Sequence, residues 1–109
     1  MRKAEIKYND QKAGMLIQDD DGYHFSYDRD YLKSEKPEPI SLTLPLQEKS
    51  FDSNILFPFF DGLIPEGWLL HIAEKSWKLN PRDRMGLLLA CCEDCIGAVS
   101  VQPIIEEEI

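Results

Sequence analysis

Apolar and polar residues alternate in several short runs of the chain, as expected for strands that bury one face. The clearest run is residues 23–27, where Tyr23, Phe25 and Tyr27 share one face and His24 falls on the opposite, exposed face. Asp19–Gly22 precedes this run and predicts a tight hairpin with a primed turn. The pattern predicts five strands in all, at residues 4–8, 13–18, 23–27, 40–44 and 97–101.

The fourth of these runs is apolar at every second position, at Ile40, Leu42 and Leu44. This alternation predicts a fourth strand, which Pro45 ends. Residues 46–54, which follow it, are mostly polar and are predicted to form a connection without regular structure.

Proline marks the first two helix starts, because it lacks an N–H and therefore fits the first helical turn. Pro58 begins a short helix that ends at Asp61-Gly62, where Gly62 is free to take a left-handed backbone. A second helix is predicted from Pro65. On it, Trp68 lies off the apolar stripe, so it either covers the helix end or is an exposed anchor for a partner.

A third helix start follows at Asn80, which is predicted to be the N-cap, with Pro81 in the first turn and Asp83 at the third helical position. Strands and helices in this order predict an α+β fold. We expect a small, mostly antiparallel sheet, or a partly closed barrel, with two or three helices packed on one side.

Length, charge and hydropathy exclude several classes of protein. The chain has 109 residues and a formal net charge of −8, with a pI of about 4.6. The length predicts one domain, and the acidic charge argues against direct nucleic-acid binding, which needs a basic surface. No apolar run approaches the ~20 residues of a membrane span, and residues 1–5 lack the apolar core of a signal peptide. We expect a cytoplasmic protein.

The three cysteines lie close together, at Cys91, Cys92 and Cys95, which is a poor disulfide framework. Cys92 and Cys95 match C-x-x-C, but His24 and His71 do not supply the remaining ligands of a zinc site at a suitable spacing. A redox C-x-x-C normally starts a helix, whereas this one follows the end of one. Small core residues are the preferred interpretation, and a thiol enzyme stays an alternative.

Other catalytic patterns are absent from the sequence. It has no phosphate-binding glycine loop, no catalytic-loop His-Arg-Asp and no serine nucleophile elbow. Asp61 and Glu66 fit helix-end electrostatics better than catalysis. We therefore expect a protein that is not an enzyme and needs no metal or cofactor.

One stretch resembles a known family. Phe60-Asp61-Gly62-Leu63-Ile64-Pro65-Glu66-Gly67 is similar to the FFDGLLPEG motif in the N-terminal subdomain of HipA-type serine/threonine kinases. Residues 39–46 (PISLTLPL) resemble its PLSLSLPL segment and residues 94–99 (DCIGAV) its GGDCAGAL segment. Cys92-Glu93 departs from the family, which usually has two small residues there. The resemblance implies that residues 1–102 form this β-rich module and that residues 103–109 are an acidic tail.

A free-standing copy of this subdomain resembles HipS, the small component of split HipBST toxin–antitoxin systems. The resemblance implies an antitoxin that binds and inhibits a HipT- or HipA-like kinase, with a HipB-like helix-turn-helix protein joined through the kinase. A subdomain that stabilises a kinase without inhibiting it remains open. We call residues 57–70 the organising stretch. We expect the partner to contact nine residues in this stretch or directly after it: Asp61, Gly62, Leu63, Ile64, Pro65, Glu66, Gly67, Trp68 and His71.

Overall fold

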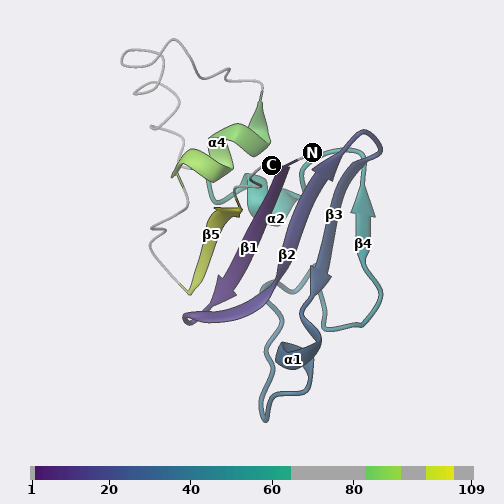
Figure 1. Cartoon of the computed structure of the whole chain (residues 1–109), viewed down its shortest axis with the longest axis vertical. Helices are drawn as coiled ribbons and strands as arrows, with labels where there is room; N and C mark the ends of the chain where they lie inside the picture. Colours follow the sequence, from purple (N-terminus) through teal and green to yellow (C-terminus); the bar gives the residue numbers. More distant parts are fainter. Residues whose placement is uncertain (1, 65–82, 92–97, 105–109) are drawn as a thin grey trace, which may run out of the picture.

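The computed structural model describes residues 2–64, 83–91 and 98–104 (Figure 1). Its strands form one five-stranded sheet in the order β4-β3-β2-β1-β5, and every pairing is antiparallel. The elements are β1 (Arg2–Tyr8), β2 (Gln11–Asp19), β3 (Gly22–Tyr27), α1 (Arg29–Leu32), β4 (Phe51–Ser53), α2 (Pro58–Asp61), α4 (Arg84–Cys91) and β5 (Val99–Ile104). The antiparallel sheet is confirmed. It is open, because β4 and β5 are separate edges, so the partly closed barrel is wrong.

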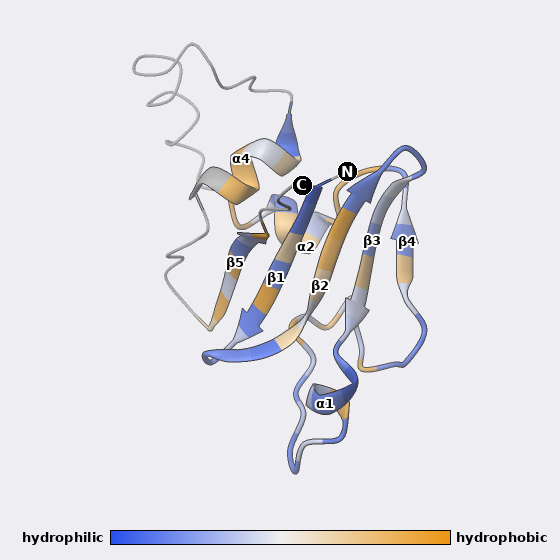
Figure 2. Cartoon of the chain, in the orientation of Figure 1, coloured by the Kyte–Doolittle hydropathy of each residue, from blue (hydrophilic) through white to orange (hydrophobic). Residues whose placement is uncertain are grey.

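The first three strands form where the alternation predicts them. In Figure 2, apolar and polar residues alternate along β1, and its inward residues Ala4 and Ile6 are fully buried. Phe25 and Tyr27 of β3 are buried on the same side, whereas His24 lies on the outer face. The β1–β2 turn has positive φ at both Asn9 (50°) and Asp10 (65°), which matches a primed hairpin turn.

The β2–β3 turn differs from the predicted primed geometry. Its central residues have no positive φ, and the left-handed conformation falls on Gly22 instead, with φ of 127°. The Asp21 N–H donates to Asp19 Oδ1 at 2.9 Å, so the aspartate side chain stabilises a different turn.

The predicted strand at residues 40–44 is wrong. This segment is a tight turn closed by an isolated bridge between Ser41 and Leu44. Ile40 and Leu44 are buried, as the pattern indicates, but Leu42 at the turn is 97% exposed. The reason is that the Tyr27 hydroxyl accepts from the Ile40 N–H and donates to the Leu44 carbonyl, so both ends of the segment enter the core around one side chain.

The fourth sheet strand is instead β4, inside the stretch predicted as a connection. Phe51 pairs with Phe25 and Ser53 with Tyr23, and the Phe51 ring stacks on Phe25 with centroids 6.3 Å apart. Three residues are too few to produce a periodic signal, so only the aromatic residue hints at this strand.

The helices lie in two places. α2 lies behind the sheet and next to α4, whereas α1 lies at the lower end of the sheet, in the connection from β3 to β4 (Figure 1). Aromatic and aliphatic side chains from the sheet, α2 and α4 form one core; its largest fully buried members are Phe25, Phe60, Ile6, Leu16, Met85, Leu87, Leu88 and Val101. No helix in the described part of the chain is long and apolar enough to cross a membrane.

The last strand runs further than the sequence predicts. β5 continues beyond residue 101 to Ile104, pairing with β1 through Lys3 and Ile104. Residues 105–109, most of the predicted acidic tail, lie outside the described residues.

Candidate functional site

The described part of the organising stretch is α2 and the turn after it. Pro58 occupies the first helical position after an extended Phe57 (φ −54°, ψ 134°), as its fixed φ favours. Phe60 is fully buried, and its ring lies against Phe25 with centroids 5.6 Å apart. The aromatic run therefore anchors α2 to the sheet and fixes the position of the residues that follow.

Four of the expected partner-binding residues form the exit from this helix. The Leu63 N–H donates to the Phe60 carbonyl at 3.0 Å and the Ile64 N–H to the Asp61 carbonyl at 3.2 Å. Gly62 is exposed and right-handed, with φ of −69°, so the expected left-handed conformation is wrong. Ile64 is buried and Leu63 packs partly against the core.

Asp61 joins α2 to α4. Its Oδ1 accepts from Arg84 Nε at 2.5 Å, and the two side chains are 42% and 33% exposed. Asp61 therefore forms an ion pair between two helices, in addition to lying at the end of α2 as predicted. Nothing in the spacing of the two residues, 23 positions apart, indicates that they meet.

A second carboxylate, that of Asp83, contacts the start of α4. Asp83 precedes the helix and accepts from the Gly86 N–H at 3.1 Å, which is the contact of an N-cap. Asp83 was expected inside the helix, at its third position, and that expectation is wrong. Asn80 and Pro81 lie outside the described residues.

The same carboxylate binds the guanidinium of Arg2, at the start of β1. Two parallel bonds of 2.8 and 2.7 Å join them, in the bidentate geometry that arginine favours with carboxylates. The hydrogen bond from Arg2 lowers the pKa of Asp83, and the same bond raises the pKa of Arg2. Arg2 also donates to Gln18 at 2.7 Å, and Gln18 donates to the Tyr23 hydroxyl at 3.2 Å. This chain of contacts joins three strands to α4.

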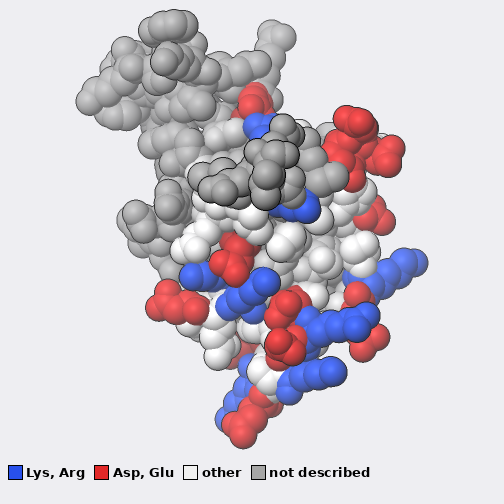
Figure 3. Space-filling view, viewed as in Figure 1, with Lys and Arg blue, Asp and Glu red and all other residues white. Residues whose placement is uncertain are grey.

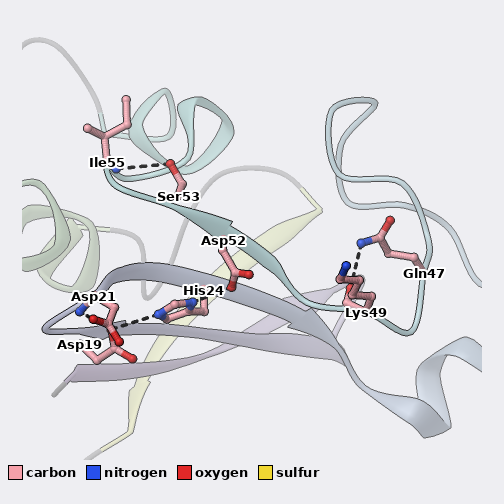
Figure 4. A network of polar contacts seen from close by, with 8 residues as sticks. All are labelled: Asp19, Asp21, His24, Gln47, Lys49, Asp52, Ser53 and Ile55. Carbon is pink, nitrogen blue, oxygen red and sulfur yellow. Dashed lines mark hydrogen bonds and ion pairs between the residues drawn. The ribbon is translucent and has the colours of Figure 1, made fainter.

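A second polar cluster lies on the outer face of the sheet (Figure 4). His24 Nδ1 lies 2.6 Å from Asp52 Oδ1 and His24 Nε2 lies 3.0 Å from Asp19 Oδ1. The hydrogen bond to Asp52, followed by that to Asp19, raises the pKa of His24, and the bond from His24 lowers the pKa of Asp19. The sequence places His24 on the correct face but misses both partners. When protonated, the imidazole joins the edge strand β4 to the β2–β3 hairpin.

The remaining candidate residues, Pro65, Glu66, Gly67, Trp68 and His71, lie outside the described residues. So do Cys92 and Cys95, on which the thiol interpretation depends. Among the described residues, no group of three or more His, Cys, Asp or Glu side chains could hold a metal ion.

The carboxylates of the described site are both engaged in ion pairs. Asp61 and Asp83 are each paired with an arginine, so neither is a free acid or base. On the face shown in Figure 3, acidic side chains gather at the β2–β3 turn, and both signs are interspersed lower down.

Comparison with known proteins gives consistent matches along the chain. The family model "HipA N-terminal domain" matches residues 4–102. An uncharacterised protein of Haemophilus influenzae is 35% identical over 102 residues, which are 94% of this chain and 92% of that protein. The solved structure of the N-terminal domain of the HipA toxin matches with a TM-score of 0.78 at 31% identity, covering 98% of this chain and 96% of that one.

A longer relative has the same region within a larger protein. The putative kinase Y4mE of Sinorhizobium fredii is 27% identical over 110 residues. The match covers all of this chain but only 26% of the kinase.

Proposed function

The chain belongs to the family of HipA N-terminal domains, and we propose that it is an antitoxin that binds and inhibits a HipA-type serine/threonine kinase. This is the role of the HipS proteins that it resembles. We assign kinase binding to residues 61–68 and His71, and the described part of this site is supported by the Asp61–Arg84 pair. The role is binding rather than catalysis, in the cytoplasm.

The observation that carries the proposal is the difference in extent between two relatives. The match fills 92% of the Haemophilus influenzae protein but 26% of the putative kinase Y4mE. The same domain thus occurs as nearly a whole protein and as one part of a much longer one. A surface that faces the rest of the chain in a long protein is available for a separate partner when the domain is a protein of its own.

Inhibition needs more than docking, because a remote contact alone gives binding without blocking the kinase. Trp68 is our candidate for the blocking group. The sequence places it off the apolar stripe, in the first turn after Pro65, and a rigid aromatic side chain loses little entropy on binding. Truncating a hot-spot tryptophan costs about 2–4 kcal/mol of binding free energy.

The test uses the full chain and a HipA-type kinase encoded in a neighbouring reading frame. Kinase autophosphorylation is measured with increasing amounts of the chain or of Trp68→Ala, and the melting temperature of each protein is recorded. We expect the parent chain to inhibit. We expect Trp68→Ala to fold normally, to bind the kinase at least ~30-fold more weakly, and to leave the kinase active even when bound. A variant that folds and inhibits fully would assign inhibition elsewhere. A parent chain that does not bind the kinase would contradict the proposal as a whole.

A second candidate function is a subdomain that completes or stabilises the kinase. The putative kinase Y4mE favours it, because there the matching region lies within the kinase chain itself. The same titration separates the two, since a completing subdomain would raise kinase activity or its thermal stability without inhibition. In either case a HipB-like DNA-binding protein would join through the kinase, because the net charge of −8 disfavours direct contact with DNA.

A further inference from the structure

The turn at residues 39–45 presents an apolar side chain that the fold does not use. Ile40 and Leu44 enter the core, whereas Leu42 between them is 97% exposed. Pro39 and Pro45 on either side of the turn are exposed as well. No charged residue occurs from Pro39 to Gln47, although 29% of the chain is charged. We call residues 39–45 the Leu42 turn.

The Leu42 turn is held in place by two buried tyrosines. The Tyr27 hydroxyl accepts from the Ile40 N–H at 3.1 Å and donates to the Leu44 carbonyl. The Tyr31 hydroxyl donates to the Glu38 carbonyl at 2.6 Å and accepts from the Glu38 N–H at 3.1 Å. The two rings stack, with centroids 6.2 Å apart and an angle of 8° between their planes.

Hydrogen bonds within the turn fix its tip. The Leu44 N–H donates to the Ser41 carbonyl at 3.1 Å, and the Thr43 N–H donates to Ser41 Oγ at 3.2 Å. Leu42 is therefore carried on a backbone that is bonded on both sides. A side chain presented in this way loses little conformational freedom when a partner covers it.

Single exposed leucines are common on protein surfaces and need no partner. Leu42 differs from Ile55, the other strongly exposed aliphatic residue of the described chain at 67%. Ile55 follows the edge strand and its N–H makes one long contact of 3.3 Å to Ser53 Oγ. Leu42 instead is the tip of a turn whose two ends are fixed by buried hydroxyl groups.

We propose that the Leu42 turn is a second docking element, whose leucine inserts into an apolar pocket of the kinase partner. This rests on the proposed function. A second copy of the chain is a poor occupant, because two molecules that each carry a net charge of −8 repel one another. The match to only 26% of the putative kinase Y4mE shows that this domain occurs beside a large remainder of chain in that protein. A separate kinase that lacks this domain would correspond to that remainder, and it would present the surface that the Leu42 turn covers.

The experiment compares Leu42→Asp with Ile55→Asp. Both change an exposed aliphatic residue to the same acid, so both add the same charge to the chain. We expect both variants to melt close to the parent, because neither side chain is buried. Dissociation constants for the kinase are measured by titration calorimetry, and binding by Leu42→Asp is expected to be at least tenfold weaker, with Ile55→Asp within threefold of the parent.

A third variant tests the presentation of the turn. Tyr27→Phe keeps the ring but removes the hydroxyl that holds Ile40 and Leu44, so it should weaken kinase binding although Leu42 is intact. Should Leu42→Asp unfold, Leu42→Ser replaces it with no change in charge.

The outcomes separate the two proposals. If the parent binds the kinase and Leu42→Asp binds as Ile55→Asp does, the docking role is overturned and the proposed function stands. If Leu42→Asp abolishes only self-association of the chain, measured by light scattering, the occupant is a second copy and the proposal is wrong. A parent chain that does not bind the kinase overturns both.

Discussion

Replacing Gly86 by alanine should stabilise the chain only when residue 83 is no longer an aspartate. A Cβ added at Gly86 would lie 2.4 Å from Asp83 Oδ2 and 3.2 Å from an Arg2 nitrogen. The carboxylate would have to rotate away, which disrupts its bonds to Arg2 and to the Gly86 N–H. In a helix without this contact, glycine to alanine stabilises by up to about 1 kcal/mol.

The magnitudes decide the sign. Loss of the N-cap costs about 0.5–2 kcal/mol, and loss of a half-exposed ion pair costs about 0.2–1 kcal/mol. These two losses oppose the gain in helix propensity. Gly86→Ala should therefore leave the stability of the parent chain unchanged or lower it by up to about 2 kcal/mol. In an Asp83→Ala background the obstacle is gone, and the same change should stabilise by up to about 1 kcal/mol.

The assay is urea unfolding of the parent, both single variants and the double variant, followed by circular dichroism. The four free energies of unfolding form a double-mutant cycle, and we expect a coupling of about 1–3 kcal/mol between the two positions. Asp83→Asn serves as a control, because asparagine keeps the cap but cannot pair with Arg2 as a charge. Equal stabilisation by Gly86→Ala in both backgrounds would refute the assigned contact.

Two further predictions follow from the sheet. The carboxylates of Asp52 and Asp19 raise the pKa of His24, so its contribution to stability is fully present below the unfolded pKa of about 6.5 and is lost as pH rises through the folded value. The difference in unfolding free energy between the parent and His24→Gln should therefore shrink from pH 6 to pH 9, and a constant difference would exclude the ion pairs as its cause. Gly14→Ala should destabilise by about 1–3 kcal/mol, because the new Cβ would lie 2.3 Å from the Ser26 carbonyl oxygen, whereas Gly62→Ala, whose nearest contact is 3.3 Å, should be tolerated; thermal melts that rank the two variants the other way would contradict the close approach of β2 and β3.

The sequence predicts the centre of the sheet better than its margin. In β1 and β3 the alternation identifies both the strand and its buried face, as Phe25 and Tyr27 show. The same rule fails at residues 40–44, because two of three alternating apolar residues are buried from the two ends of a turn. A buried tyrosine hydroxyl that satisfies the Ile40 N–H and the Leu44 carbonyl makes that arrangement stable, and alternation carries no information about it.

The position of helix α2 was predictable from the sequence, but the contacts of the charged residues around it were not. The aromatic and proline-rich motif identifies α2 and its exit, including Asp61. Its partner Arg84 is 23 residues away, and Arg2 and Asp83 are 81 residues apart. The chain offers 12 basic and 20 acidic residues, so sequence alone does not indicate which pairs meet. Only the packing of α4 beside α2 and the first strand selects them.

Binding to the kinase and inhibition of the kinase should be separable by experiment, because Leu42 is proposed to act on affinity and Trp68 on the activity of the bound kinase. Loss of the Leu42 anchor lowers the affinity, so Leu42→Asp should still inhibit fully once its concentration is raised in proportion to its weaker dissociation constant. Loss of the blocking group weakens binding as well, but it also removes inhibition from the bound complex, so a kinase saturated with Trp68→Ala should stay active. Because mass action can compensate only the first defect, titrations carried to saturation distinguish a docking residue from an inhibitory one. A kinase that stays active when saturated with Leu42→Asp, but is fully inhibited by Trp68→Ala, would show that the two roles are reversed. The Leu42 turn would then be the element that reaches the kinase's active cleft.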